Sequence, residues 1–197
     1  TTAHAYRDFL ANDGLDKRIE QKLATLDIED VSALAEAGRT IRNWIVEAPL
    51  PAKLEAEGAE WIQIDEPYLS VGAPMEIARH AVERLAAGIR VPVAMHVCGT
   101  VGKILPDLLT WKGVRLLSHG FMGDKNDDVL TSKDLQRSAK MLGLGCIDTK
   151  SSEVESEDAV AGLIQRALEL LPADRIALHP DCGLRMLPRD AVRAKLR

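Results

Sequence analysis

The chain has 197 residues, of which 46% are hydrophobic and 4% aromatic, so it has the length and apolar content of one ordinary domain with a core. Its net charge of −5 provides no basic surface for nucleic acid, and it contains neither a visible secretory leader nor an apolar run of about 18 residues that would cross a membrane. We therefore expect a cytoplasmic protein with no nucleic-acid or membrane partner.

Short apolar runs alternate with amphipathic stretches after a first segment, residues 1–53, that is predicted to be helical and shows no clear strand. The expected strands cover residues 61–65, 91–97, 114–118, 145–148 and 175–179. The expected helices between them cover residues 74–88, 103–113, 133–143 and 156–171. This alternation is typical of a parallel sheet covered by helices, and the period alone fits either a doubly wound sheet or part of a (β/α)8 barrel.

Polar side chains follow each expected strand directly. They form five short clusters: Asp65-Glu66-Pro67, His96-x-Cys98-Gly99, Ser118-His119-Gly120, Asp148-x-Lys150 and Asp181-Cys182-Gly183. In a barrel, the carboxyl ends of the strands converge on one opening, where catalytic residues from several strands meet. The pattern therefore favours a barrel with one site at that opening.

His96 and Cys98 are candidate metal ligands, because residues two apart on a strand point to the same side. Zinc accepts imidazole nitrogen and thiolate sulfur together but needs three or four ligands, and Cys182 at another strand end is the natural third. The alternative is a strand end that carries two soft side chains. Three cysteines are an odd number, which favours metal binding or catalysis over a disulfide framework. The third, Cys146 in "GLGCIDT", is predicted to be buried and inert.

Four stretches, in order, resemble the catalytic barrel of cobalamin-independent methionine synthase in its archaeal-type core form: "EWIQIDEPYLS", "MHVCG", "GLGCIDTKSSEVES" and "HPDCGLRMLP". The resemblance covers residues 54–197. It implies a (β/α)8 TIM barrel, like those of uroporphyrinogen decarboxylase and methionine synthase, whose N-terminal strands are missing or divergent here. We accordingly expect residues 1–197 to be a single catalytic barrel domain, with residues 1–53 as its divergent helical part.

The resemblance further implies a zinc-dependent methyltransferase that moves a methyl group to the thiol of homocysteine and gives methionine. His96, Cys98 and Cys182 fall on three of the family's zinc ligands. Asp65 is the expected catalytic and substrate-binding carboxylate, which would pair with the ammonium group of homocysteine, and Glu66 would share that task. The core form implies a methyl-corrinoid donor, methylcobalamin or a corrinoid protein, rather than a folate.

The sequence departs from the family at the fourth ligand, where Gly120 stands in place of a glutamate. Three arrangements fit the residues: His119 or Ser118 turns toward the ion, Asp124 reaches it from the following loop, or the ion keeps a water in an open position. We favour the open position. Lys150 also stands near the place of a histidine found in the folate-using enzymes, which suggests a different proton donor or none.

Two other functions fit the same pattern. A corrinoid-dependent methyltransferase could act on another thiol, such as coenzyme M, although a sulfonate acceptor would favour Arg or Lys at the position of Asp65. A non-catalytic zinc-binding relative would keep the fold without the reaction. Methyl transfer to homocysteine, measured beside transfer to coenzyme M, separates these functions.

Overall fold

A computed structural model describes residues 54–124 and 126–197 of the chain. These residues belong to one compact unit that spans residues 50–197. The helical prediction for residues 1–53 lies outside the described residues.

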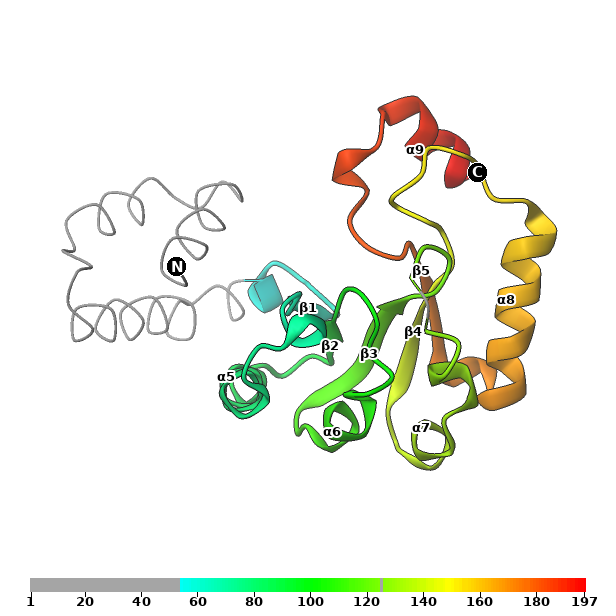
Figure 1. Ribbon diagram of the computed structural model, residues 1–197. Coiled ribbons are helices and arrows are strands. Elements are labelled where there is room, and N and C mark those ends of the chain that lie inside the picture. Colours follow the sequence, from blue (N-terminus) through cyan, green and yellow to red (C-terminus); the bar gives the residue numbers. More distant parts are fainter. Residues whose placement is uncertain (1–53, 125) are drawn as a thin grey trace, which may run out of the picture. The chain divides into compact units, whose positions relative to one another are not determined.

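Five parallel strands form one sheet in which each strand pairs with the next one along the chain (Figure 1). Neighbours in the sheet are thus consecutive in sequence, whereas the strand order of a doubly wound sheet reverses at a switch point. The observed order is that of a barrel segment, which resolves the ambiguity left by the sequence. The strands are β1 (Ile62–Asp65), β2 (Val93–His96), β3 (Val114–Gly120), β4 (Met141–Gly145) and β5 (Ile176–His179).

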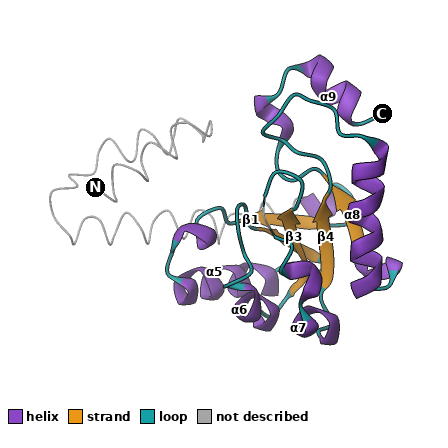
Figure 2. Ribbon diagram, turned by 45° about the vertical axis from the view of Figure 1, so that its right-hand side comes forward, coloured by secondary structure: helices purple, strands orange, loops and turns teal. Residues whose placement is uncertain are grey.

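Helices connect successive strands and pack against one face of the sheet (Figure 1). A last helix lies beyond the carboxyl ends of the strands, and Figure 2 shows it above the arrowheads of β3 and β4. Acidic residues in the first turn favour several of these helices through the helix dipole, and a serine side chain caps two of them. The helices are α5 (Met75–Ala87), α6 (Leu105–Thr110), α7 (Lys133–Arg137), α8 (Glu157–Leu170) and α9 (Arg189–Lys195).

The region around β4 differs from the sequence prediction. The helix expected over residues 133–143 ends at Arg137, and the strand expected at 145–148 lies at Met141–Gly145 instead. The helical pattern was misleading here because Leu142 and Leu144 also fit a buried strand, and pairing with β3 and β5 overrides the local preference. β3 likewise continues to Gly120, two residues past its expected end.

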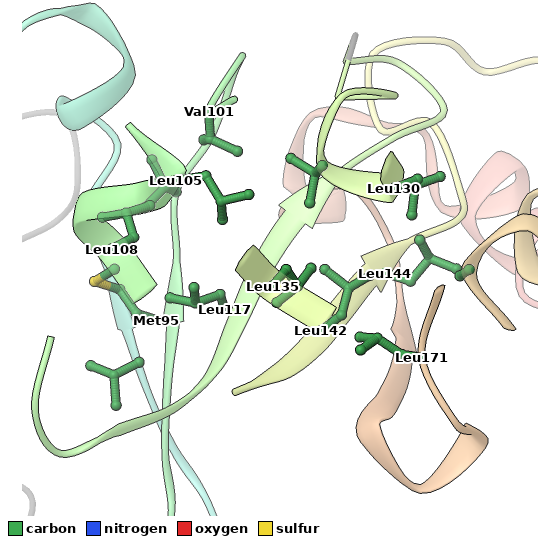
Figure 3. Close-up of a cluster of buried hydrophobic side chains, with 14 of the residues drawn as sticks. Met95, Val101, Leu105, Leu108, Leu117, Leu130, Leu135, Leu142, Leu144 and Leu171 are labelled. Atoms are coloured by element: carbon green, nitrogen blue, oxygen red, sulfur yellow. The ribbon is translucent and has the colours of Figure 1, made fainter. Parts of the chain in front are cut away.

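The apolar core lies between the sheet and the helices (Figure 3). One row of paired residues on the helix-facing side of the sheet contains Met95, Leu117 and Leu142, all of which are fully buried. Leu105 and Leu108 of α6 contribute to the same cluster from the helix layer. This layer holds the strands in register and so fixes where their carboxyl ends lie.

One row on the opposite side of the sheet consists of small and polar residues. The row one residue further along the strands contains Asp65, His96, Ser118, Gly143 and Ala177. Paired residues of parallel strands point to the same face, so these side chains line the side away from the helices. Within the described part of the chain, no helix is long and apolar enough to cross a membrane.

Candidate metal site

Three predicted ligands meet at the carboxyl ends of β2 and β5. The Nε2 atom of His96 lies 3.2 Å from the Sγ atom of Cys98, and the Sγ atoms of Cys98 and Cys182 are 3.4 Å apart. All three donor atoms lie within 4.8 Å of one another. Tetrahedral bonds to zinc of about 2.0–2.3 Å place neighbouring donors about 3.5–3.8 Å apart. These two contacts are slightly shorter than the donor spacing of a zinc site, so the side chains need to move only a little to enclose such an ion.

The exposure of the three side chains increases from His96 through Cys98 to Cys182. His96 is 5% exposed, Cys98 is half-buried and Cys182 is exposed. Burial lowers the pKa of the His96 imidazole, and burial together with the adjacent Cys182 thiol raises the pKa of Cys98 to about 12. Both shifts favour the neutral forms, so the imidazole keeps a lone pair for a metal ion. Because Cys182 is exposed, this group of three side chains is open to solvent on that side.

Turns of the chain direct the ligand loops. After Cys98 the backbone adopts a left-handed conformation at Gly99, where φ is 77°, and a Cβ atom there would lie 2.9 Å from the Ser70 hydroxyl oxygen. A glycine is therefore required for the chain to leave β2 in this direction. The amide group of the buried Asn126 donates to the carbonyl oxygens of Gly99 and Gly120 and accepts from the Val101 N–H. Asn126 thus connects the loop after β2 to the end of β3.

Asp181 organises a second loop beside the ligands. Its buried carboxylate accepts hydrogen bonds from the backbone N–H groups of Phe121, Met122 and Gly123, at 2.5–3.2 Å. Burial raises the pKa of Asp181, although these three donors act in the opposite direction. Because Asp181 precedes Cys182, the loop after β3 and the third ligand are held by one side chain.

Gly120 and Asp124 share a small space beside the site. A Cβ atom at Gly120 would lie 2.8 Å from the Oδ2 atom of Asp124 and 3.0 Å from Asp181. A longer side chain at position 120 would therefore displace the Asp124 carboxylate. That carboxylate accepts from the Gly99 N–H at 3.3 Å and forms an ion pair with Lys150. Lys150 itself is exposed and neutralises this acidic group.

His119 points away from the three ligands. It is fully buried, its Nδ1 atom hydrogen-bonds the Val97 carbonyl oxygen at 3.2 Å, and its Nε2 atom lacks a partner among the described residues. Because side chains alternate along a strand, His119 lies on the helix-facing side, whereas Ser118 faces the site. Burial lowers the pKa of His119 to about 4. The Ser118 hydroxyl already contacts His96 Nδ1 at 2.9 Å and His179 Nε2 at 3.1 Å.

The two acidic residues after β1 differ in their surroundings. Asp65 is exposed, pairs in register with His96 and accepts a hydrogen bond from the Gln63 side chain at 2.8 Å. Glu66 accepts from the Tyr68 N–H at 3.1 Å and so stabilises its own turn. Asp65 is therefore the carboxylate of this pair that lies beside His96 and is exposed to solvent.

The predicted buried cysteine is confirmed as buried. Cys146 is 6% exposed, and its Sγ atom contacts the His179 carbonyl oxygen at 3.6 Å. Burial raises the pKa of the Cys146 thiol. Sequence reasoning did not identify Asn126 and His179 as site residues. A signal for His179 was present, since it stands at the end of an expected strand three residues before Cys182.

The chain is similar to known proteins over most of its length. Residues 45–197 match the family model described as the catalytic domain of cobalamin-independent synthase. The methionine synthase of Methanothermobacter marburgensis is 43% identical over 146 residues, which cover 73% of this chain and 46% of that protein. The methionine synthase of Methanocaldococcus jannaschii is 37% identical over 146 residues, which cover 69% of this chain and 46% of that protein. The chain thus spans about half the length of these curated relatives.

Residues 1–66 match a second family model, the AMP/ATP-binding domain of pyruvate phosphate dikinase. A phosphoenolpyruvate synthase of Neisseria meningitidis is 56% identical over 57 residues, which cover 29% of this chain and 7% of that protein. The assignment of residues 1–53 to the barrel stays a prediction.

Solved structures support the same fold. A B12-independent methionine synthase from Shewanella sp. W3-18-1, in complex with selenomethionine, superposes with a TM-score of 0.67 at 21% identity and covers 86% of this chain and 53% of that chain. A methyltransferase from Methanosarcina mazei gives a TM-score of 0.61 at 21% identity, covering 96% of this chain and 55% of that chain. The parallel sheet and its helices are thus part of a TIM barrel, and the chain belongs to the cobalamin-independent synthase catalytic-domain family.

Proposed function

We propose that the chain is the zinc-binding part of a methyltransferase that transfers a methyl group to the thiol of homocysteine. The single observation that carries this proposal is the group formed by His96, Cys98 and Cys182. One imidazole nitrogen and two sulfurs are ligands that zinc prefers, and a three-ligand site is typical of catalytic rather than structural zinc. When bound, zinc would hold the acceptor sulfur as a thiolate, which is the nucleophilic form.

The fourth position of the proposed site is open to the acceptor. His119 lies on the other face of the sheet, and the Ser118 hydroxyl is used by two imidazoles. Asp124 was the carboxylate considered as a fourth ligand, but it is already paired with Lys150 and the Gly99 N–H. These contacts favour an open position, where the substrate sulfur can bind.

Asp65 is proposed to bind the amino group of homocysteine. It is exposed, and its register partner is the ligand His96. Neighbouring strands lie about 4.8 Å apart, so a small amino acid could contact both the metal position and this carboxylate. Glu66 was expected to share the task, but its contact with the Tyr68 N–H supports a role in the turn.

The methyl donor is proposed to be methylcobalamin or a corrinoid protein, as expected for the core form of the family. The cytoplasmic location likewise stays a prediction. Methylcobalamin and methyl-folate as donors, and homocysteine and coenzyme M as acceptors, can be compared in one set of assays on the full chain with zinc. We expect methyl transfer from methylcobalamin to homocysteine, and none from methyl-folate or to coenzyme M.

An acceptor test separates the two acidic residues. Asp65→Asn should raise KM for homocysteine about 10- to 100-fold, the value of a hydrogen bond between charged groups. The matched variant Glu66→Gln should change KM about twofold or less, as surface substitutions usually do. Methyl transfer to coenzyme M in preference to homocysteine would contradict the proposal that homocysteine is the acceptor. Zinc binding without transfer to either thiol would indicate a non-catalytic zinc-binding relative.

A further inference from the structure

A chain of hydrogen bonds runs from His96 away from the ligand group. The Nδ1 atom of His96 lies 2.9 Å from the Ser118 hydroxyl oxygen, which lies 3.1 Å from Nε2 of His179. The Nδ1 atom of His179 is 2.5 Å from the carbonyl oxygen of Pro180. Ser118 is 1% exposed and His96 5%, so water competes little for these contacts.

The sheet provides space for this chain at one position. Gly143 of β4 is the register partner of Ser118. A Cβ atom at Gly143 would lie 2.8 Å from Nε2 of His179 and 2.9 Å from the Cα atom of Ser118. Any larger residue would push the imidazole away, so the glycine allows His179 to reach across from β5 to the hydroxyl.

The direction of the hydrogen bonds follows from their last acceptor. A carbonyl oxygen can only accept, so Nδ1 of His179 must carry the proton that faces Pro180. In a neutral imidazole the other nitrogen is then an acceptor, and Nε2 of His179 accepts from the Ser118 hydroxyl. The Ser118 oxygen in turn accepts from Nδ1–H of His96. This order leaves Nε2 of His96 without a proton, on the side of Cys98.

We infer that Ser118 and His179 are positioning residues that fix the tautomer of His96, with its Nε2 lone pair directed at the Cys98 and Cys182 sulfurs. The use of that lone pair by zinc rests on the proposed function, but the tautomer is a property of the metal-free chain. In the reverse order, the proton on Nε2 of His96 would have to leave before a metal could bind there. Hydrogen-bond partners of ligand histidines commonly account for 10- to 100-fold in metal affinity.

The tautomer can be measured directly by long-range ¹H–¹⁵N correlation NMR on the metal-free full chain, with reductant present. A pH of about 8 keeps imidazoles with an ordinary pKa of about 6.5 neutral. His96→Gln identifies the His96 signals by their loss. We expect His96 to carry its proton on Nδ1 in the wild type. In Ser118→Ala, we expect the Nε2-protonated tautomer to appear.

Variants of His179 test the second link while Ser118 stays in place. His179→Gln offers a carbonyl oxygen where Nε2 was, so the hydroxyl keeps an acceptor and the tautomer should be retained. His179→Leu removes the acceptor and should give a mixture of tautomers. Zinc affinity, measured by competition with a chelating dye, should fall about 10-fold or more in Ser118→Ala and His179→Leu, and less in His179→Gln.

Ser132→Ala is the matched control, because it removes a serine hydroxyl that caps α7 far along the chain from the ligands. It should leave zinc affinity and the His96 tautomer unchanged. A wild-type His96 protonated on Nε2 would overturn the inference, as would an unchanged tautomer in both Ser118→Ala and His179→Leu. Failure of the wild type to bind zinc would instead contradict the proposed function, while the NMR result would still decide the inference.

Discussion

The two faces of the sheet carry different chemistry although they are one residue apart along each strand. On the helix-facing side, Met95, Leu117 and Leu142 form a row of fully buried apolar side chains. On the other side, the next row places His96 beside Ser118, and Gly143 leaves space beside them. The first row is held by dispersion and burial, and the second by directed hydrogen bonds. A substitution should therefore affect either stability or metal affinity, depending on its face.

The largest effect on zinc affinity is expected at the two cysteines of the proposed site. Cys98→Ser and Cys182→Ser should each lower zinc affinity about 100- to 1000-fold, since a complete zinc site contributes about 10–16 kcal/mol over four ligands. Cys146→Ala is the matched control and should leave affinity unchanged, because Cys146 is buried outside the ligand group. Competition with a chelating dye measures all three. Loss of zinc in the Cys146 variant would mean that the wrong thiol had been chosen.

On the apolar face, Leu117→Ala should lower the free energy of unfolding by about 3 kcal/mol, because it opens a cavity in a fully packed layer. Urea unfolding of the zinc-free chain measures this change. Zinc affinity under native conditions should stay within about threefold, since Leu117 points away from the site. A large loss of affinity with little loss of stability would contradict the separation of the two faces.

His119 is a fully buried polar residue on the apolar face and makes the stability of the fold depend on pH. Its pKa is about 4 in the folded chain, against about 6.5 unfolded. Between these values the unfolded chain binds the proton more readily, so stability is lost as the pH falls from about 6.5 toward 4. Between pH 7.5 and 4.5 this amounts to about 2.5 kcal/mol.

The test uses His119→Phe, which removes the titrating group and keeps an aromatic ring. Urea unfolding of the wild type and the variant between pH 7.5 and 4.5 should show the smaller decline in the variant. Equal declines would mean that His119 titrates normally in the folded chain.

Breaking the connection between the loop after β2 and the end of β3 should give the smallest loss of unfolding free energy among these predictions. Asn126→Ala removes three hydrogen bonds to Gly99, Val101 and Gly120, and should lower the free energy of unfolding by about 1–2 kcal/mol. Zinc affinity should also fall, because the loop after Cys98 loses its support. Ser138→Ala, a control at the residue that follows α7, should affect stability alone. An unchanged zinc affinity in Asn126→Ala would show that the loop holds its position without the amide.

The sequence predicted that there are five strands and that His96, Cys98 and Cys182 lie together, because alternation and strand-end polarity are local signals. It misplaced β4, since "KMLGLG" fits both a helix and a strand until the partners β3 and β5 are known. Asn126 and the Ser118–His179 contact could not be predicted, because each joins residues distant in sequence through the geometry of the sheet. The ion pair between Asp124 and Lys150 is another such long-range contact.

X-ray absorption at the zinc edge of the zinc-loaded full chain tests the central claim most directly. The account predicts one zinc bound by two sulfurs and two light atoms, of which one is the imidazole of His96 and the other a water-derived oxygen in the open position. Two sulfurs with two imidazoles would contradict the open position and require a second histidine at the metal. A single sulfur, or no bound zinc at all, would contradict the ligand set of His96, Cys98 and Cys182 itself.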